Sequence, residues 1–200
     1  ASVAYVKGLA MRTDITGQGQ DLSMFVDVSG KRQVLFNNAT KQAQDLGAAT
    51  ADLPFVMGEI KSSIKPNGQT KTLLGYECAG YDIEMSMPMT IMSEDLAIQA
   101  AGTVWIAKNV PGDAEYRAFS KAAVEAGLMT APFGQGPQAK GLAQFQASFL
   151  EKGIPLEQQM QMTFSGVGEM FQTMAQAGMG NYGMTMQVTS ISVDPIPAGT

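Results

Sequence analysis

Histidine is absent from the 200 residues, and cysteine occurs once, at position 78. The absence of histidine excludes Ser-His-Asp and Cys-His nucleophilic machinery, because both use imidazole as the general base. It also excludes the usual histidine-containing zinc and copper(II) sites. A single cysteine forms no internal disulfide, so the cysteine content does not distinguish an oxidising from a reducing compartment.

Long apolar runs and basic clusters are missing too. No stretch reaches the roughly 18 consecutive apolar residues of a membrane span, so we predict none. The 13 basic residues are scattered in a chain of net charge -5, which argues against a nucleic-acid partner. The chain lacks the charged and then apolar start of a signal peptide, although the opening ASVAYV would equally suit a mature chain whose export signal was removed.

Alternating apolar and polar residues fill the first half of the chain and predict strands. The second half adds two helical patterns, 113–126 with Asp113 as the N-cap and 138–152, ended by Gly127 and Gly153. We predict one domain, residues 1–200, of the α+β class, with an antiparallel sheet and helices inserted late. The predicted strands are 3–15, 22–28, 33–36, 75–87, 96–108, 154–164 and 182–193.

Shorter features have weaker signals. We predict turns at 37–40 and 65–69, a short helix over 53–61, and a third helical pattern that brings Met170 and Met174 together. The segment GMGNYG, 178–183, matches the dinucleotide-binding pattern G-x-G-x-x-G. That pattern needs a strand before it and a helix after it, and here the order is reversed, so we interpret it as a helix end and a turn.

Two carboxylates, Asp82 and Glu84, lie two residues apart and would share one face of a strand. Paired carboxylates can serve as acid and base in catalysis. A solvated strand face is the interpretation we favour, because Tyr81, Ile83 and Met85 alternate with them. We therefore expect a protein that is not an enzyme and has no cofactor.

Methionine is the most informative residue type. Met-x-Met occurs at three places: Met85 and Met87, continuing to Met89, then Met160 and Met162, and then Met184 and Met186. On a strand, residues i and i+2 point to the same side, so the thioethers at each place lie on one face. Apolar neighbours indicate that these faces point to the core. Methionine is flexible and suits apolar surfaces that adapt to varied ligands, so we predict a pocket for a lipid acyl chain or another hydrophobic ligand. Its predicted lining is Ile83, Met85, Met87, Leu156, Met160, Met162, Phe164, Met184, Met186 and Val188.

Two alternatives remain open. Thioethers are soft ligands, so Met85, Met87, Met89 and Met92 are an alternative copper(I) site. Cys78 has the opposite parity on the same strand and would point away from it, as an inert buried thiol. The third hypothesis is a structural envelope module whose methionines only fill the core.

The middle of the chain carries a family resemblance. The runs TKTLLGYECAGYDIEM, GTVWIAKNVPGDAEYRAF, GIPLEQQMQMTFSG and VTSISVDPIP resemble a bacterial exported domain family of unknown function. That family is similar to the periplasmic lipoprotein-carrier (LolA-like) group. The positions that carry the resemblance are Gly75, Tyr76, Cys78, Tyr81, Trp105, Ala107 and Lys108.

The resemblance implies a strongly curved antiparallel sheet, an unclosed half-barrel with helices covering its concave face and an apolar cavity between them. It also implies a periplasmic or secreted location. It supplies no catalytic residues. A likeness of fold does not by itself establish a function, so the prediction of a hydrophobic ligand rests on the methionine pattern.

Overall fold

The computed structural model describes residues 1–17, 20–46, 55–91, 94–128, 137–166, 168, 171–172 and 180–196. This part of the chain is mostly antiparallel β-sheet with two helices, α1 (Asp113–Glu125) and α2 (Pro137–Leu150). The N-terminal sheet holds, in chain order, β1 (Ser2–Lys7), β2 (Ala10–Gly17), β3 (Gln20–Asp27), β4 (Arg32–Asn37) and β5 (Gln42–Asp45). The C-terminal sheet holds β6 (Phe55–Met57), β7 (Lys61–Leu73), β8 (Tyr76–Ile91), β9 (Glu94–Ala107), β10 (Ile154–Gly166) and β11 (Asn181–Gln187).

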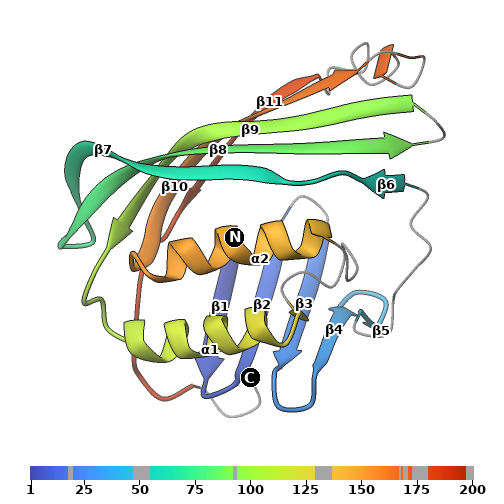
Figure 1. Ribbon diagram of the computed structural model, residues 1–200. Helices are drawn as coiled ribbons and strands as arrows, with labels where there is room; N and C mark the ends of the chain where they lie inside the picture. Colours follow the sequence, from blue (N-terminus) through green and yellow to red (C-terminus); the bar gives the residue numbers. More distant parts are fainter. Residues whose placement is uncertain are drawn as a thin grey trace.

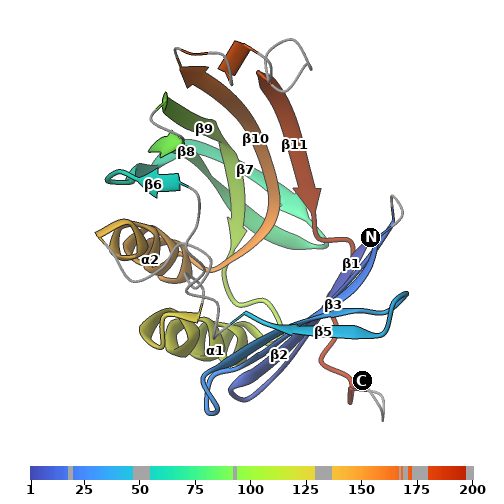
Figure 2. The same ribbon diagram turned by 90° about the vertical axis from the view of Figure 1, so that its right-hand side faces the viewer.

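The C-terminal sheet has the order β11-β10-β9-β8, and β6 and β7 both pair with β8 at its far side. The helices lie between the two sheets (Figures 1 and 2). Phe119 and Ala123 of α1 pack against Val26 of the N-terminal sheet. Phe145 and Phe149 of α2 pack against the C-terminal sheet. Each helix therefore buries its apolar side on a different sheet.

The prediction of antiparallel strands with helices inserted late in the chain is confirmed, since α1 and α2 lie between β9 and β10 in a mostly β structure. The expected single curved half-barrel differs from the structure, because the strands divide into two sheets and neither sheet closes on itself. Alternation marks which residues form strands, but it does not specify which strands pair across long stretches of chain. The division of the strands between two sheets therefore could not be predicted from the sequence pattern.

Three local predictions are corrected. The predicted strand over 3–15 is two strands joined by a tight turn at Gly8, where φ is 58°. The predicted helix over 53–61 contains strand β6 instead, which pairs with the end of β8. The predicted turn at 65–69 is a register shift inside β7, and the hairpin turn follows at Leu74 and Gly75, which both have positive φ.

The helix ends predicted at Gly127 and Gly153 are confirmed. Gly127 has a φ of 74° and follows α1, and Gly153 has a φ of 134° and follows α2. The N-cap of α1 is Gly112, so Asp113 lies in the first turn, where its carboxylate pairs with Arg117 at 2.8 Å. The turn after β4 is confirmed. The predicted helical pattern at Met170 and Met174 lies outside the described residues.

Candidate functional site

The methionine pairs are gathered on one side of the C-terminal sheet. Residues directly opposite each other on neighbouring strands share a face. Met85 pairs with Ala100, which pairs with Met162, and Met160 pairs with Met184. We call this side the methionine face. Its methionines are Met85, Met87 and Met89 on β8, Met160 and Met162 on β10, and Met184 and Met186 on β11.

Helix α2 covers part of the methionine face. Its Phe145 and Phe149 rings meet edge to face, with centroids 4.8 Å apart, and pack against the core that contains Ile83 and Met160. Met160 is 8% exposed and Ile83 is 1% exposed. Met85 and Met162 pack at the border of this core and are half-buried. Burial is therefore greatest where α2 lies against the sheet.

The β11 side of the same face is open. Met184 is 45% exposed, Met186 50% and Tyr182 43%. Tyr182 stacks on Phe164, with ring centroids 6.0 Å apart, and so extends the apolar surface along the face. Met184 lies directly opposite the buried Met160. One continuous thioether surface thus runs from a buried core to solvent.

Two residues of the predicted lining lie elsewhere. Leu156 is fully buried in a second cluster that contains Cys78 and Ala107, on the opposite side of the sheet. The register of β10 shifts between Pro155 and Glu157, so alternation does not carry from Met160 back to Leu156. Val188 lies beyond the end of β11 and packs against the same second cluster.

Cys78 lies apart from the methionines, as strand parity indicates. Its side chain is fully buried in the second cluster, and burial raises the pKa of its thiol. In the alternative copper set, Met85, Met87 and Met89 follow one another along β8, and Met92 lies outside the described residues. Alternate residues of one strand are about 6.6 Å apart, so thioethers in a single row converge poorly on one ion.

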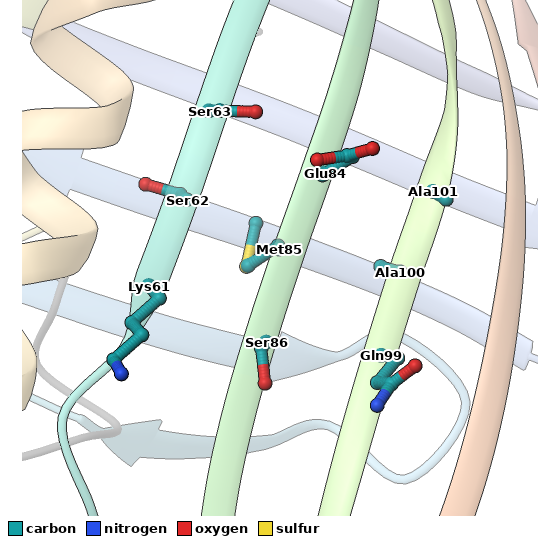
Figure 3. Close-up of a pocket in the computed structure, with 9 residues that line it drawn as sticks. All are labelled: Lys61, Ser62, Ser63, Glu84, Met85, Ser86, Gln99, Ala100 and Ala101. Atoms are coloured by element: carbon teal, nitrogen blue, oxygen red, sulfur yellow. The ribbon is translucent and has the colours of Figure 1, made fainter.

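The opposite side of the C-terminal sheet, which we call the outer face, carries the second cluster at one end and polar residues along β7, β8 and β9 further on. A hollow of about 400 Å³ lies there, over β7, β8 and β9 (Figure 3). The register places six of its lining residues in two cross-strand rows on the outer face, and Ser62, Met85 and Ala100 lie between these rows. The two rows are Lys61, Ser86 and Gln99, and Ser63, Glu84 and Ala101.

The two carboxylates considered as an acid and base pair lie on this outer face. Asp82 accepts hydrogen bonds from Asn67 Nδ2 at 3.0 Å and from Thr103 Oγ1 at 3.1 Å. Glu84 lines the hollow. Asp82 is thus used in cross-strand hydrogen bonds, which fits the interpretation of a solvated strand face.

A charged bridge crosses the outer face further along. Lys71 Nζ lies 2.6 Å from Glu157 Oε1 and 4.4 Å from the centre of the Trp105 ring. Gln159 also donates to Glu157, at 2.9 Å. The hydrogen bond from Lys71 holds the pKa of the buried Glu157 below its usual range. A Cβ on Gly80 would lie 2.9 Å from the Trp105 ring, so this glycine leaves room for the indole.

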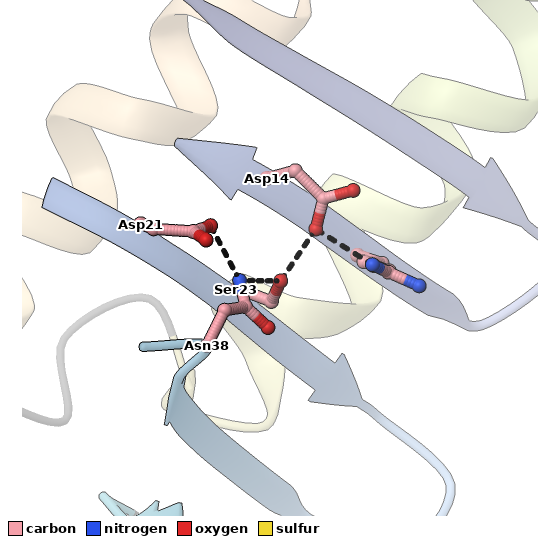
Figure 4. Close-up of polar contacts among 5 residues, drawn as sticks. Asp14, Asp21, Ser23 and Asn38 are labelled. Carbon is pink, nitrogen blue, oxygen red and sulfur yellow. Dashed lines mark hydrogen bonds and ion pairs between the residues drawn. The ribbon is translucent and has the colours of Figure 1, made fainter. Parts of the chain in front are cut away.

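The N-terminal sheet carries a closed polar network (Figure 4). Asp14 accepts from Arg12 Nε and from Ser23 Oγ, both at 2.7 Å. Asn38 Nδ2 donates to Ser23 at 3.1 Å and to Asp21 at 2.9 Å. Burial alone would raise the pKa of Asp14, but the bonds from Arg12 and Ser23 outweigh it and lower that pKa. These groups satisfy one another and stabilise the sheet.

Comparisons of this chain with protein-family models, with curated proteins and with solved structures found no match. Within the described ranges, neither helix is long and apolar enough to cross a bilayer.

Sequence reasoning missed the outer-face features. Lys71 and Glu157 are 86 residues apart, and neither has a local pattern that indicates the other. The rows of the hollow likewise depend on the register among β7, β8 and β9. Tyr182 is absent from the predicted lining, although its stacking on Phe164 makes it part of the methionine face.

Proposed function

We propose that this protein binds a hydrophobic ligand, such as a lipid acyl chain, on the methionine face, without catalysing a reaction. The observation that supports it best is the exposure of Met184 and Met186 beside the buried Met160. Apolar side chains this exposed on a contiguous face mark binding surfaces. Thioether side chains adapt to ligands of varied shape.

The proposed binding site is the uncovered half of the methionine face. Phe164 and Tyr182 supply a rigid aromatic end, and Met162, Met184 and Met186 supply the adaptable part. Burial of apolar area gives about 25 cal/mol per Å², so a chain that covers this half gains several kcal/mol before the entropy cost of binding is subtracted. The polar hollow on the outer face offers no comparable apolar contact.

Displacement of a fluorescent fatty acid tests the proposal, together with mass spectrometry of lipids extracted from the denatured protein. The double variant Met184→Gln and Met186→Gln should weaken probe binding about tenfold or more, because each glutamine loses apolar contact with the ligand. Thr185→Gln is the matched control, since Thr185 lies between them and points to the outer face. If neither a bound lipid nor probe binding is found, the structural module with a filled core is the better account.

Copper(I) remains a second candidate, on a different set of methionines from the one along β8. Met160 and Met184 are directly opposite, with Met162 and Met186 on the diagonals. Opposite Cβ atoms are about 5 Å apart, which allows two thioethers to reach one soft ion. In competition with a colourimetric copper(I) chelator, Met160→Leu with Met184→Leu should abolish binding, whereas Met85→Leu with Met87→Leu should not. Equal affinity in the two double variants would exclude this site.

The resemblance to an exported family leads us to propose a periplasmic or secreted location as well. Cell fractionation of the producing organism with an antibody against the protein tests this. Recovery in the cytoplasmic fraction alone would contradict it.

A further inference from the structure

The two edges of the C-terminal sheet differ in how they are protected. Edge strands present unpaired backbone N–H and C=O groups, and lysine, proline and bulges normally discourage pairing there. Strand β7 carries all three devices: Lys61, Lys65 and Lys71, Pro66, and a register shift after Pro66. That edge is built to stay unpaired.

Strand β11 has none of these devices. Its sequence, NYGMTMQ, contains no charged residue and no proline, and its pairing with β10 is regular over the whole strand. Each of its seven residues is exposed. Of the described strands, only β10 pairs with β11. As far as the described residues go, its other edge therefore presents an unpaired, uncharged row of backbone groups next to exposed apolar side chains.

The sequence of β11 is also complementary to itself. Strand Asn181–Gln187 has Met184 at its centre, so antiparallel pairing about a two-fold axis there places Met184 opposite Met184 of a second copy. The same register places Tyr182 opposite Met186, and sulfur–aromatic contacts of this kind are favourable. On the other side, Asn181 meets Gln187, and their side-chain amides can exchange hydrogen bonds. No charges are brought together.

We propose that β11 is a homodimerisation strand, which pairs with β11 of a second copy about a two-fold axis at Met184. Such an interface uses the same patch on both copies and closes on itself. Pairing in the plane of the sheet leaves the face of the sheet free, so the two methionine faces join into one longer apolar surface. The dimer rests on the edge strand alone and stands whether or not the methionine face binds a ligand.

Sedimentation velocity across a concentration series tests the proposal. The unmodified chain should sediment as a dimer that dissociates on dilution. Met184→Lys and Met184→Glu each place like charges directly opposite one another, which is destabilising, so each variant alone should be monomeric. A mixture of the two should form a heterodimer, because lysine then faces glutamate. Recovery on mixing shows that neither variant lost the dimer by misfolding.

Val3→Lys is the matched control, because Val3 is 50% exposed on β1, an edge strand of the N-terminal sheet. This variant should remain dimeric. A monomeric wild-type protein at its highest soluble concentration would overturn the proposal. Dissociation by Val3→Lys with an intact Met184→Lys dimer would also overturn it, since the dimer would then use the other sheet.

Discussion

Truncating two opposed methionines to alanine should have very different effects on stability. Met160 and Met184 lie directly opposite each other on the same face, Met160 on β10 between β9 and β11 and Met184 on the edge strand β11. Met160 is 8% exposed and Met184 is 45% exposed. The pair therefore compares a covered and an uncovered position of the methionine face with the side-chain chemistry held constant.

The magnitudes follow from burial. A fully buried methionine side chain contributes about 1.5–3 kcal/mol, and its removal from a packed core adds the cost of the cavity. Met160→Ala should therefore lower the free energy of unfolding by about 2–4 kcal/mol. Met184→Ala removes a side chain that is nearly half exposed and leaves an open surface, so its cost should stay below about 1 kcal/mol.

Urea unfolding followed by circular dichroism measures both values. The protein should be dilute enough that the midpoint does not change on further dilution, so that association between copies does not contribute. Equal losses for the two variants would refute the reasoning. They would mean that the β11 side of the methionine face is covered in solution, as in a filled core.

Three further results are expected. Gly102→Ala should lower the free energy of unfolding by about 3 kcal/mol or more, because the added Cβ would lie 1.9 Å from the carbonyl oxygen of Gln159. The same unfolding assay measures this loss, and a stable variant would contradict the packing of β9 against β10. Glu157→Gln should cost about 2 kcal/mol at pH 7. Because pairing with Lys71 lowers the pKa of Glu157 in the folded protein, this stabilisation is full above the unfolded-state pKa of the carboxyl group and is lost as the pH falls through the lowered folded-state pKa. A difference in unfolding free energy between the wild type and the variant that does not change with pH would refute this prediction. Cys78 is fully buried with a raised pKa and should react with a thiol reagent only in denaturant; rapid labelling of the native protein would contradict its placement.

The face of the sheet on which each strand residue lies could be predicted from the sequence, because side chains alternate along a strand with a period of two. Met85, Met87, Met160 and Met162 share a face because β8 and β10 are regular over those residues. The same rule failed at Leu156, where one extra residue in β10 reverses the alternation. The signal available in that stretch is Pro155, because a proline inside a strand is typical of a bulge or a strand end.

Pairing between strands that are distant in the chain could not be predicted from the sequence. The strand predicted over 75–87 continues through Pro88 to Ile91 as β8. The proline is tolerated because it lies between the stretches of β8 that pair with β7 and with β6, where Gly58 donates to its carbonyl oxygen at 2.7 Å. Such a gap in the neighbouring edge depends on the tertiary fold, and local propensity does not encode it.

Photo-crosslinking with a diazirine-bearing fatty acid, followed by peptide mapping, tests the central claim most directly. If the methionine face binds an acyl chain, the label should be saturable and should fall on peptides from β10 and β11, at Met162, Phe164, Tyr182, Met184 or Met186. Excess unlabelled fatty acid should prevent it. Labelling confined to the polar hollow at Lys61 and Glu84, or labelling that excess fatty acid does not reduce, would contradict the claim.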